Sequence, residues 1–440
     1  MSSLFRKIMM TASLAMAAFA ASVHADSNDS RYHEDKYNDD YDGRGFNGNG
    51  EAKRDASVQL GPRPFYLVKG MDEGKLKDRL MMCEKGPFYK TDFSIGHRGA
   101  AMQFPEHPKE SYEAAARMGA GIVECDVTFT KDGELVCRHS ECDLHTTTNI
   151  VATPLNNSCS VPYTVGGPAP KCCTSDITLS QFKTLKGKMD ASNPAATSAQ
   201  GYLGRTASWR TDLYTGRATL MTLKESIALN KANGVKHTPE LKSGDPVRIQ
   251  AVFSGQGNYS QRMIDTLVAA RIDPKDVWLQ SFDGRDILYW VQNAPQFRTQ
   301  AVYLDSIDLS RNPLVAGFSM DKLRELKRHG VKIITPPMPA LLSVNANNEI
   351  VPSQYAIDIK SLGFDIITRT FERSDLRQGA LKGASKGAFY YNLDAEGRAI
   401  KKNGDMYKAL DVLARQVEII GIFSDWPATV SYYANCMGLK

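Results

Sequence analysis

Residues able to carry out acid–base chemistry gather in one short stretch of the chain, residues 94–140. The stretch contains histidines, carboxylates and an arginine, each placed at or near the end of an apolar run. They are His97, Arg98, Glu124, Asp126 and His139. Imidazoles, carboxylates and a guanidinium together suit metal-assisted acid–base chemistry on an anionic substrate.

Glu124 and Asp126 are separated by one residue in an apolar run, and alternate residues of a strand share one face. Two carboxylates that converge at a strand end repel each other unless a proton or a cation separates them. We therefore expect a hard divalent cation with oxygen ligands. The plainer alternative, a solvated strand face, remains open for this pair taken alone.

A second acidic strand, H-T-P-E-L-K-S, places Glu240 and Lys242 on one face. If it neighbours the strand of Glu124 and Asp126, three carboxylates meet and a cation site becomes credible. Lys242 and Arg98 would then hold phosphate oxygens, although such residues are more often simple ion pairs.

The two imidazoles near such a site suit the roles of general base and general acid. We expect His24, His33 and His329 to be ordinary polar residues. His107, His145 and His237 stay open between structural and functional roles.

Apolar runs alternate with helical patterns from Phe93 onward, which indicates βαβ units and a parallel sheet. Strands are expected at 93–97, 121–127, 134–138, 236–241, 276–281, 299–304, 331–335, 364–368 and 418–423, with 134–138 forming a hairpin extension of the second strand. Helices are expected at 109–118, 222–233, 261–270, 285–292, 320–328, 353–362 and 406–416. About eight units over ~340 residues predict an α/β fold of the closed (β/α)8 TIM-barrel type.

Residues 140–218 interrupt this rhythm with turn-rich sequence, so we expect an insertion after the second strand. Four of the eight cysteines fall between Cys142 and Cys173, and two disulfides are expected there, with three pairings open. A structural zinc site is the alternative. Cys125, between the two carboxylates, is expected to be a small buried thiol.

The first 25 residues read as a secretory signal, with Arg6 and Lys7 before an apolar run and a cleavage site near Ala25. Residues 26–60 are polar and read as a disordered linker, and residues 61–440 form the barrel domain. We expect a secreted or periplasmic protein. The formal charge is +5, and the chain after the acidic stretch at 26–55 is mildly basic, which suits an anionic substrate, although most such charge is simply solvated surface. The absence of a Lys/Arg run argues against nucleic-acid binding.

These motifs resemble those of the glycerophosphodiester phosphodiesterases over roughly residues 93–435. The resemblance is carried by H-R-G at 97–99, P-E-H at 105–107, G-A at 119–120, E-C-D-V at 124–127, T-K-D-G at 130–133, His139, E-L-K at 240–242, Q-S-F at 280–282 and S-D-W-P at 424–427. Two departures stand out: Pro108 follows P-E-H, and Ser140 stands where an aspartate is commoner after the second histidine, which puts the orientation of His139 in doubt.

The resemblance implies a TIM barrel that hydrolyses glycerophosphodiesters to glycerol 3-phosphate and an alcohol. It implies a Ca²⁺ or Mg²⁺ ion held by Glu124, Asp126 and Glu240. His97 would accept a proton and His139 would donate one, with a cyclic phosphate as intermediate. It also implies that the substrate contacts Arg98, Lys242 and Trp426.

Two other functions remain open at this point. A phospholipase D-like or phosphatidylinositol-type enzyme would share the barrel and the histidine pair, but it would need an exposed apolar rim that the sequence does not identify. A non-catalytic phosphodiester-binding protein is disfavoured, because both histidines and all three carboxylates are present. We expect a small-molecule substrate and no stable membrane insertion; the sequence does not indicate the oligomeric state.

Overall fold

A computed structural model describes residues 58–305, 320–374, 386–391, 393 and 398–440. The predicted signal peptide lies outside these residues, as does the predicted linker except for its last three residues, of which Leu60 is buried. Among the described residues, none of the helices combines the length and the hydropathy needed to cross a bilayer.

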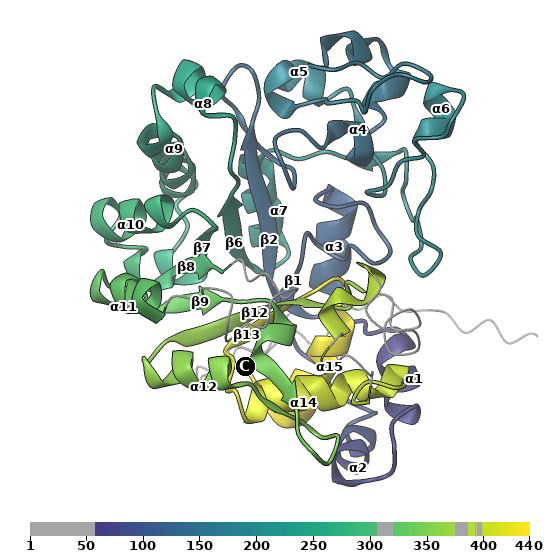
Figure 1. Ribbon diagram of the computed structural model, residues 1–440, viewed down its shortest axis with the longest axis vertical. Helices are drawn as coiled ribbons and strands as arrows, with labels where there is room; N and C mark the ends of the chain where they lie inside the picture. The colour runs from purple at the N-terminus through teal and green to yellow at the C-terminus, as the bar shows by residue number, and fades with distance from the viewer. Residues whose placement is uncertain (1–57, 306–319, 375–385, 392, 394–397) are drawn as a thin grey trace, which may run out of the picture. The chain divides into compact units, whose positions relative to one another are not determined.

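Eight parallel strands form a closed barrel (Figure 1). The first strand pairs with both the last and the second, so that Gly96 lies opposite Ser424 on one side and Val123 on the other. In order around the barrel the strands are β1 (Thr91–Gly96), β2 (Ala120–Phe129), β6 (Lys236–Leu241), β7 (Leu279–Ser281), β8 (Ala301–Leu304), β9 (Ile333–Thr335), β12 (Asp365–Phe371) and β13 (Gly421–Ser424). The predicted TIM-barrel fold is confirmed.

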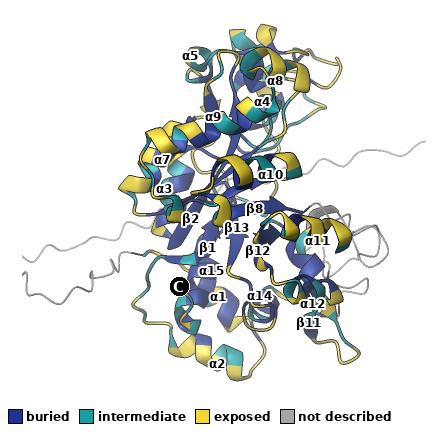
Figure 2. Ribbon diagram, turned by 90° about the vertical axis from the view of Figure 1, so that its left-hand side faces the viewer, coloured by how far each residue is buried: buried dark blue, intermediate teal, exposed yellow. Residues whose placement is uncertain are grey.

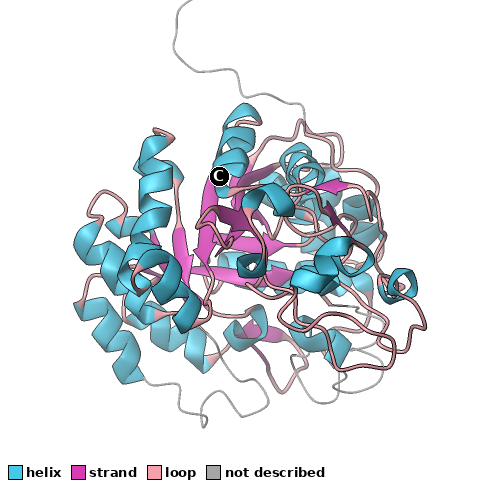
Figure 3. Cartoon of the chain, turned by 90° about the horizontal axis from the view of Figure 1, so that it is seen from above, coloured by secondary structure: helices cyan, strands magenta, loops and turns pink. Residues whose placement is uncertain are grey.

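Helices surround the barrel, as the view from above shows (Figure 3). They are α3 (Lys109–Arg117), α7 (Leu223–Ala232), α8 (Pro246–Phe253), α9 (Gln256–Ala269), α10 (Gly284–Asn293), α11 (Met320–Arg328), α12 (Gln354–Ser361), α14 (Met406–Arg415) and α15 (Pro427–Met437). Before β1 come α1 (Arg63–Lys69) and α2 (Lys75–Met82). Local sequence sets several of these ends: Thr222 and Glu225 bond each other's backbone N–H groups at the start of α7, a capping box.

The buried residues fall into an inner and an outer layer. Apolar side chains of the strands fill the barrel interior, namely Ile95, Ile122, Val302, Ile333, Ile367 and Phe423. A much larger cluster lies between strands and helices and includes Tyr112, Trp290 and Leu413. Figure 2 shows the resulting pattern, with buried strands and helices whose outer faces are exposed. This rigid core fixes the carboxyl ends of the strands, where the chemistry-bearing residues lie.

The predicted hairpin and insertion are both present. Strand β3 (Leu135–Cys137) runs antiparallel to β2, and the chain then leaves the barrel until α7. The insertion has its own small apolar core, with Leu144, Ile150 and Phe182 buried. Its regular elements are short: α4 (Leu144–Thr147), α5 (Leu179–Phe182), α6 (Ala199–Tyr202), β4 (Lys186–Gly187) and β5 (Ala218–Thr219). A further hairpin of β10 (Leu342–Val344) and β11 (Ile350–Pro352) lies after β9.

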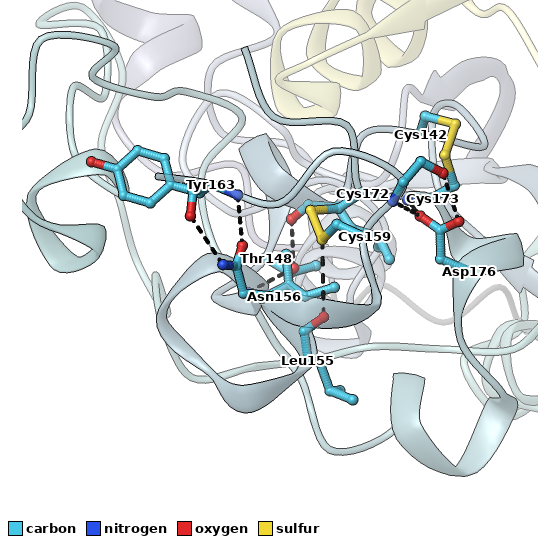
Figure 4. Close-up of a disulfide and its surroundings, with 12 residues drawn as sticks. Cys142, Thr148, Leu155, Asn156, Cys159, Tyr163, Cys172, Cys173 and Asp176 are labelled. Carbon is cyan, nitrogen blue, oxygen red and sulfur yellow. Dashed lines mark hydrogen bonds between the residues drawn. A yellow bond between two sulfur atoms is a disulfide. The ribbon is translucent and has the colours of Figure 1, made fainter. Parts of the chain in front are cut away.

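All eight cysteines are paired. The insertion contains the two expected bridges, Cys142–Cys173 and Cys159–Cys172, shown in Figure 4, which excludes a zinc site formed by these thiols. The two remaining bridges are Cys83–Cys436 and Cys125–Cys137. Cys125 is buried as expected, but the expectation of a thiol there is wrong, because its sulfur is bonded to that of Cys137 on the paired strand β3.

Candidate active site

Three carboxylates from two adjacent strands meet at the carboxyl end of the barrel. Glu124 and Asp126 lie on β2, Glu240 lies on β6, and the register places Asp126 directly opposite Glu240. All three are buried, and one oxygen atom of each lies within 4.8 Å of one oxygen of the others. The predicted convergence of three acidic side chains is present.

The pKa values of this cluster show that its negative charges are not fully compensated by the protein. Burial, followed by the charges of Asp126 and Glu240, raises the pKa of Glu124 well above its usual range. Burial likewise raises the pKa of Glu240 to about 7, against the opposing charge of Lys242. Among the described residues, Asp126 Oδ1 is buried without a hydrogen-bond partner. Buried carboxylates with an unmatched oxygen fit a hard divalent cation.

Hydrogen bonds hold the carboxylates in place from outside the cluster. Gln280 Nε2 on β7 donates to Glu124 Oε1 at 2.8 Å, and His107 Nε2 lies 2.9 Å from Asp126 Oδ2. His107 is fully buried, and its Nδ1 lies 3.0 Å from the Tyr112 hydroxyl. The open question about His107 is thus answered: it orients a carboxylate of the cluster.

His97 follows β1 and is fixed by a carboxylate from the far end of the chain. Its Nδ1 lies 2.5 Å from Asp425 Oδ1, and its Nε2 lies 3.8 Å from Glu124 Oε2. Burial, then the charge of Arg98, lowers the pKa of His97 to about 4. The ring is therefore neutral at neutral pH. Because Nδ1 donates to Asp425, Nε2 is free to accept a proton.

Arg98 lies beside His97 and is held on both its backbone and its side chain. Its N–H donates to Glu124 Oε2 at 3.0 Å, and its Nη1 donates to Glu106 Oε1 at 2.8 Å. The turn after Arg98 needs Gly99, whose φ is +94° and where a Cβ would come within 2.3 Å of the Ser111 hydroxyl oxygen. The H-R-G sequence thus has a steric as well as a chemical origin.

Lys242 follows β6, and its Nζ lies 2.5 Å from Glu240 Oε1. Arg98 and Lys242 follow β1 and β6, the two strands that flank β2, so both charges lie next to the carboxylate cluster. Two cations next to a candidate metal site are suited to binding the oxygens of an anion.

His139 follows β3 and is half-buried. Burial, then the charges of Arg98 and Lys242, lowers the pKa of its ring to about 2, and Asp126 and Glu106 oppose this shift. His139 therefore lies within electrostatic reach of both cations. Although Ser140 replaces the commoner aspartate, the carboxylate of Asp143 accepts the N–H of Ser140 at 3.1 Å and so braces this turn.

Trp426 follows Asp425 at the end of β13 and is 7% exposed. Its indole N–H is buried without a hydrogen-bond partner among the described residues. An indole N–H normally finds an acceptor when buried, which leaves this donor available to a substrate oxygen.

Arg373 is a site residue that the sequence did not single out. Its Nη1 donates to Asp425 Oδ2 at 3.0 Å, and its Nη2 donates to Glu106 Oε1 at 2.8 Å and lies 3.5 Å from Asp190 Oδ2. It thus connects the partners of His97 and Arg98 to the insertion, which contributes Asp190. Asp425 and Gln280 were also missed as site residues. Their positions at the ends of predicted strands, Asp425 in S-D-W-P and Gln280 in Q-S-F, could have identified them in the sequence.

In the part of the chain that the structure describes, neither of the remaining open histidines forms a hydrogen bond or ion pair with the three carboxylates. His237 lies on β6, where its Nδ1 is 3.4 Å from Asn230 Nδ2 of α7, and burial lowers its pKa to about 4. His145 belongs to the insertion, and its Nδ1 is buried.

Comparison with known proteins places these features in context. The sequence profile of the glycerophosphoryl diester phosphodiesterase family matches residues 97–334. An extracellular protein of Arthroderma benhamiae is 42% identical over 254 residues, which span 57% of this chain and 100% of that protein. A glycerophosphodiester phosphodiesterase of Arabidopsis thaliana is 22% identical over 356 residues, 78% of this chain and 85% of its own. A solved Silicibacter pomeroyi structure assigned to the same enzymes shares the fold, with a TM-score of 0.52, 16% identity, and coverage of 79% of this chain and 94% of that one.

Proposed function

The chain belongs to the glycerophosphoryl diester phosphodiesterase family, and we propose that it hydrolyses glycerophosphodiesters to glycerol 3-phosphate and an alcohol in a cation-dependent reaction. The observation that carries this proposal is the convergence of three buried carboxylates beside His97, Arg98 and Lys242 at one end of the barrel. A phosphodiester needs cationic groups for its oxygens and a proton acceptor and donor for the two alcohols.

Glu124, Asp126 and Glu240 would hold a divalent cation, Ca²⁺ or Mg²⁺. Support comes from the three oxygen atoms within 4.8 Å of one another and from the raised pKa values of Glu124 and Glu240. When bound, such a cation would neutralise negative charge on the phosphodiester.

Arg98 and Lys242 would bind non-bridging phosphate oxygens, and Trp426 would line the glycerol end. Arg98 has its Nη1 committed to Glu106, while its Nε lies 3.4 Å from Asp126. The remaining guanidinium donors would be free for phosphate.

His97 would act as the proton acceptor. Its neutral ring, with Nδ1 bonded to Asp425, can take the proton of the glycerol 2-hydroxyl at Nε2. The oxygen of that hydroxyl would form a bond to phosphorus as the bond to the leaving alcohol breaks. A cyclic phosphate results, which water then opens to glycerol 3-phosphate.

His139 would donate a proton to the leaving alcohol oxygen. In the free protein its pKa is lowered to about 2 by burial and by Arg98 and Lys242. A phosphodiester anion bound between Arg98 and Lys242 would offset both charges and so raise this pKa. We propose that substrate binding itself makes His139 a competent acid.

The protein would act outside the cytoplasm, in the medium or the periplasm. Four disulfides support this location, because such bonds persist in oxidising compartments. The 42% identical relative from Arthroderma benhamiae is itself described as extracellular.

The test is release of glycerol 3-phosphate from glycerophosphoglycerol and glycerophosphocholine, with an intact phospholipid as the alternative substrate. His97→Ala and His139→Ala should each lose at least about 100-fold in kcat while keeping the wild-type Tm. His329→Ala, an exposed histidine on the barrel flank, is the matched control. If either active-site variant kept wild-type kcat, the assigned role of that histidine would be wrong.

A further inference from the structure

A guanidinium that the proposed reaction does not use lies at the mouth of the barrel. Arg369 is on β12, and its Nη2 donates to the carbonyl oxygen of Asp305 at 2.8 Å. Its Nη1 donates to the carbonyl oxygen of Thr335, the last residue of β9. Its guanidinium carbon lies 4.8 Å from the ring centre of Phe282, which directly follows β7. The side chain therefore reaches from β12 past β9 and β8 to the end of β7.

The charge of Arg369 is not matched by an ion pair. Both of its hydrogen-bond acceptors are carbonyl oxygens, and among the described residues no carboxylate comes within 4.0 Å of its guanidinium. The Asp305 carboxylate accepts the Tyr355 hydroxyl at 3.0 Å instead, and burial raises the pKa of Asp305 against that hydrogen bond and the charges of Lys322 and Arg369. Burial lowers the pKa of Arg369 itself, and the charges of Tyr390, Glu240, Asp305 and Glu124 oppose this shift. Arg369 is half-buried, and a cation that is partly removed from water without its own counter-ion is unfavourable unless an anionic ligand supplies one.

Phe282 presents an exposed surface between two cations. Its side chain is exposed, at 38%, and Lys242 Nζ lies 5.7 Å from its ring centre on the side of the carboxylate cluster. The guanidinium carbon of Arg369 lies 4.8 Å from the same ring centre. A headgroup that extends from the phosphate site over Phe282 would therefore lie near both Lys242 and Arg369. Two positive charges favour an anionic headgroup and disfavour a quaternary ammonium group.

The position of Arg369 separates it from the scissile phosphate. The proposed phosphate ligands, Arg98 and Lys242, follow β1 and β6, next to the carboxylates on β2 and β6. Arg369 comes from β12, and its contacts are with Asp305 just after β8, with Thr335 at the end of β9 and with Phe282 just after β7, whereas β1 and β2 contribute none of them.

We propose that Arg369 binds an anionic group on the leaving alcohol, so that the enzyme prefers glycerophosphodiesters whose headgroup carries a phosphate or carboxylate. This inference rests on the proposed function, since it names the substrate class of the same site.

The matched substrates are glycerophosphoinositol 4-phosphate, glycerophosphoinositol and glycerophosphocholine, compared by kcat/KM. The wild type should prefer the phosphorylated headgroup over the unphosphorylated one by on the order of 10-fold, the effect of about one charge-assisted contact. Arg369→Gln should abolish that preference while leaving kcat/KM for glycerophosphoinositol within about threefold.

Two further variants keep the test decisive. Phe282→Asp places a carboxylate beside Arg369 on an exposed position, and it should remove the preference even if Arg369→Gln fails to fold. Arg285→Gln is the control: Arg285 is an exposed cation on the same side of the barrel, and it already pairs with Asp283. That variant should keep the wild-type preference.

The outcomes separate this inference from the proposed function. If the wild type hydrolyses all three diesters without preference, Arg369 does not bind an anionic headgroup. The same conclusion follows if Arg369→Gln or Phe282→Asp lowers kcat/KM equally for all three diesters. If the wild type releases glycerol 3-phosphate from none of them, the proposed function itself fails, and the inference fails with it.

Discussion

The contact between His97 and Asp425 gives the sharpest single perturbation of the proposed chemistry. The Asp425 carboxylate accepts the His97 Nδ1 proton at 2.5 Å and also binds Arg373 at 3.0 Å. In Asp425→Asn the amide is nearly the same size, but it carries no charge and can present N–H to the ring. His97 would then carry its proton on Nε2, where it could not accept another.

The magnitude follows from the kind of bond that is lost. A hydrogen bond to a charged group contributes about 1.5–3 kcal/mol. At 1.36 kcal/mol for each factor of ten, kcat should fall roughly 10- to 100-fold. KM should change little, because Asp425 is buried behind His97 and is not a proposed substrate contact.

The assay is glycerol 3-phosphate release at saturating and limiting diester, with Tm measured alongside. Asp286→Asn is the matched control, because Asp286 is also a buried carboxylate with several hydrogen bonds, from Ser260, Ser281 and Gln256, but has no contact with either histidine. That control should lose stability without losing kcat. A kcat for Asp425→Asn within twofold of wild type would refute the idea that Asp425 orients the base.

Two further predictions concern the hairpin that carries His139. Replacing Cys125 and Cys137 by serine should cost about 3 kcal/mol of unfolding free energy by the chain-entropy estimate and should also reduce kcat, because the bridge joins the carboxylate strand to the strand before His139. The Cys159–Cys172 bridge closes a loop of nearly equal length within the insertion, so replacing both of its cysteines by serine should cost similar stability with little change in kcat. Equal kcat losses in the two double variants would contradict this reasoning. Burial raises the pKa of Asp143 from 3.8 to about 6, so the folded protein binds the carboxyl proton of Asp143 more tightly than the unfolded chain does. The free energy of unfolding should therefore fall as pH rises from about 4 to 6. Asp143→Asn should remove that fall, about 3 kcal/mol, and parallel pH dependence in both proteins by denaturant titration would count against it.

The sequence predicted those parts of the protein that depend on local periodicity. Each of the nine expected strand runs and seven expected helices overlaps the corresponding element, although the observed ends differ by several residues at β12, β13 and the start of α9. The alternation of Glu124 with Asp126 placed both on one strand, and the regular βαβ units predicted the barrel in which that strand lies beside the strand of Glu240. Helices α8 and α15 were missed because each begins at a proline that follows a strand end by only a few residues.

The contacts that depend on closure of the barrel could not be predicted in this way. His97 and Asp425 are 328 residues apart, and they meet only because β1 pairs with β13. In the sequence, Arg369 and Arg373 look like ordinary charged residues at a strand end. The folded barrel shows that Arg373 lies within ion-pair distance of three carboxylates, whereas Arg369 has none within that distance among the described residues.

The central claim is that Glu124, Asp126 and Glu240 hold a cation without which the site does not act. The most direct measurement is the rate of glycerol 3-phosphate release by EDTA-treated protein, before and after addition of Ca²⁺ or Mg²⁺, together with Tm under the same conditions. We predict no turnover until a cation is restored, a higher Tm with the cation, and neither response in Asp126→Asn. Full activity of the EDTA-treated protein, or an identical cation response in Asp126→Asn, would contradict the claim.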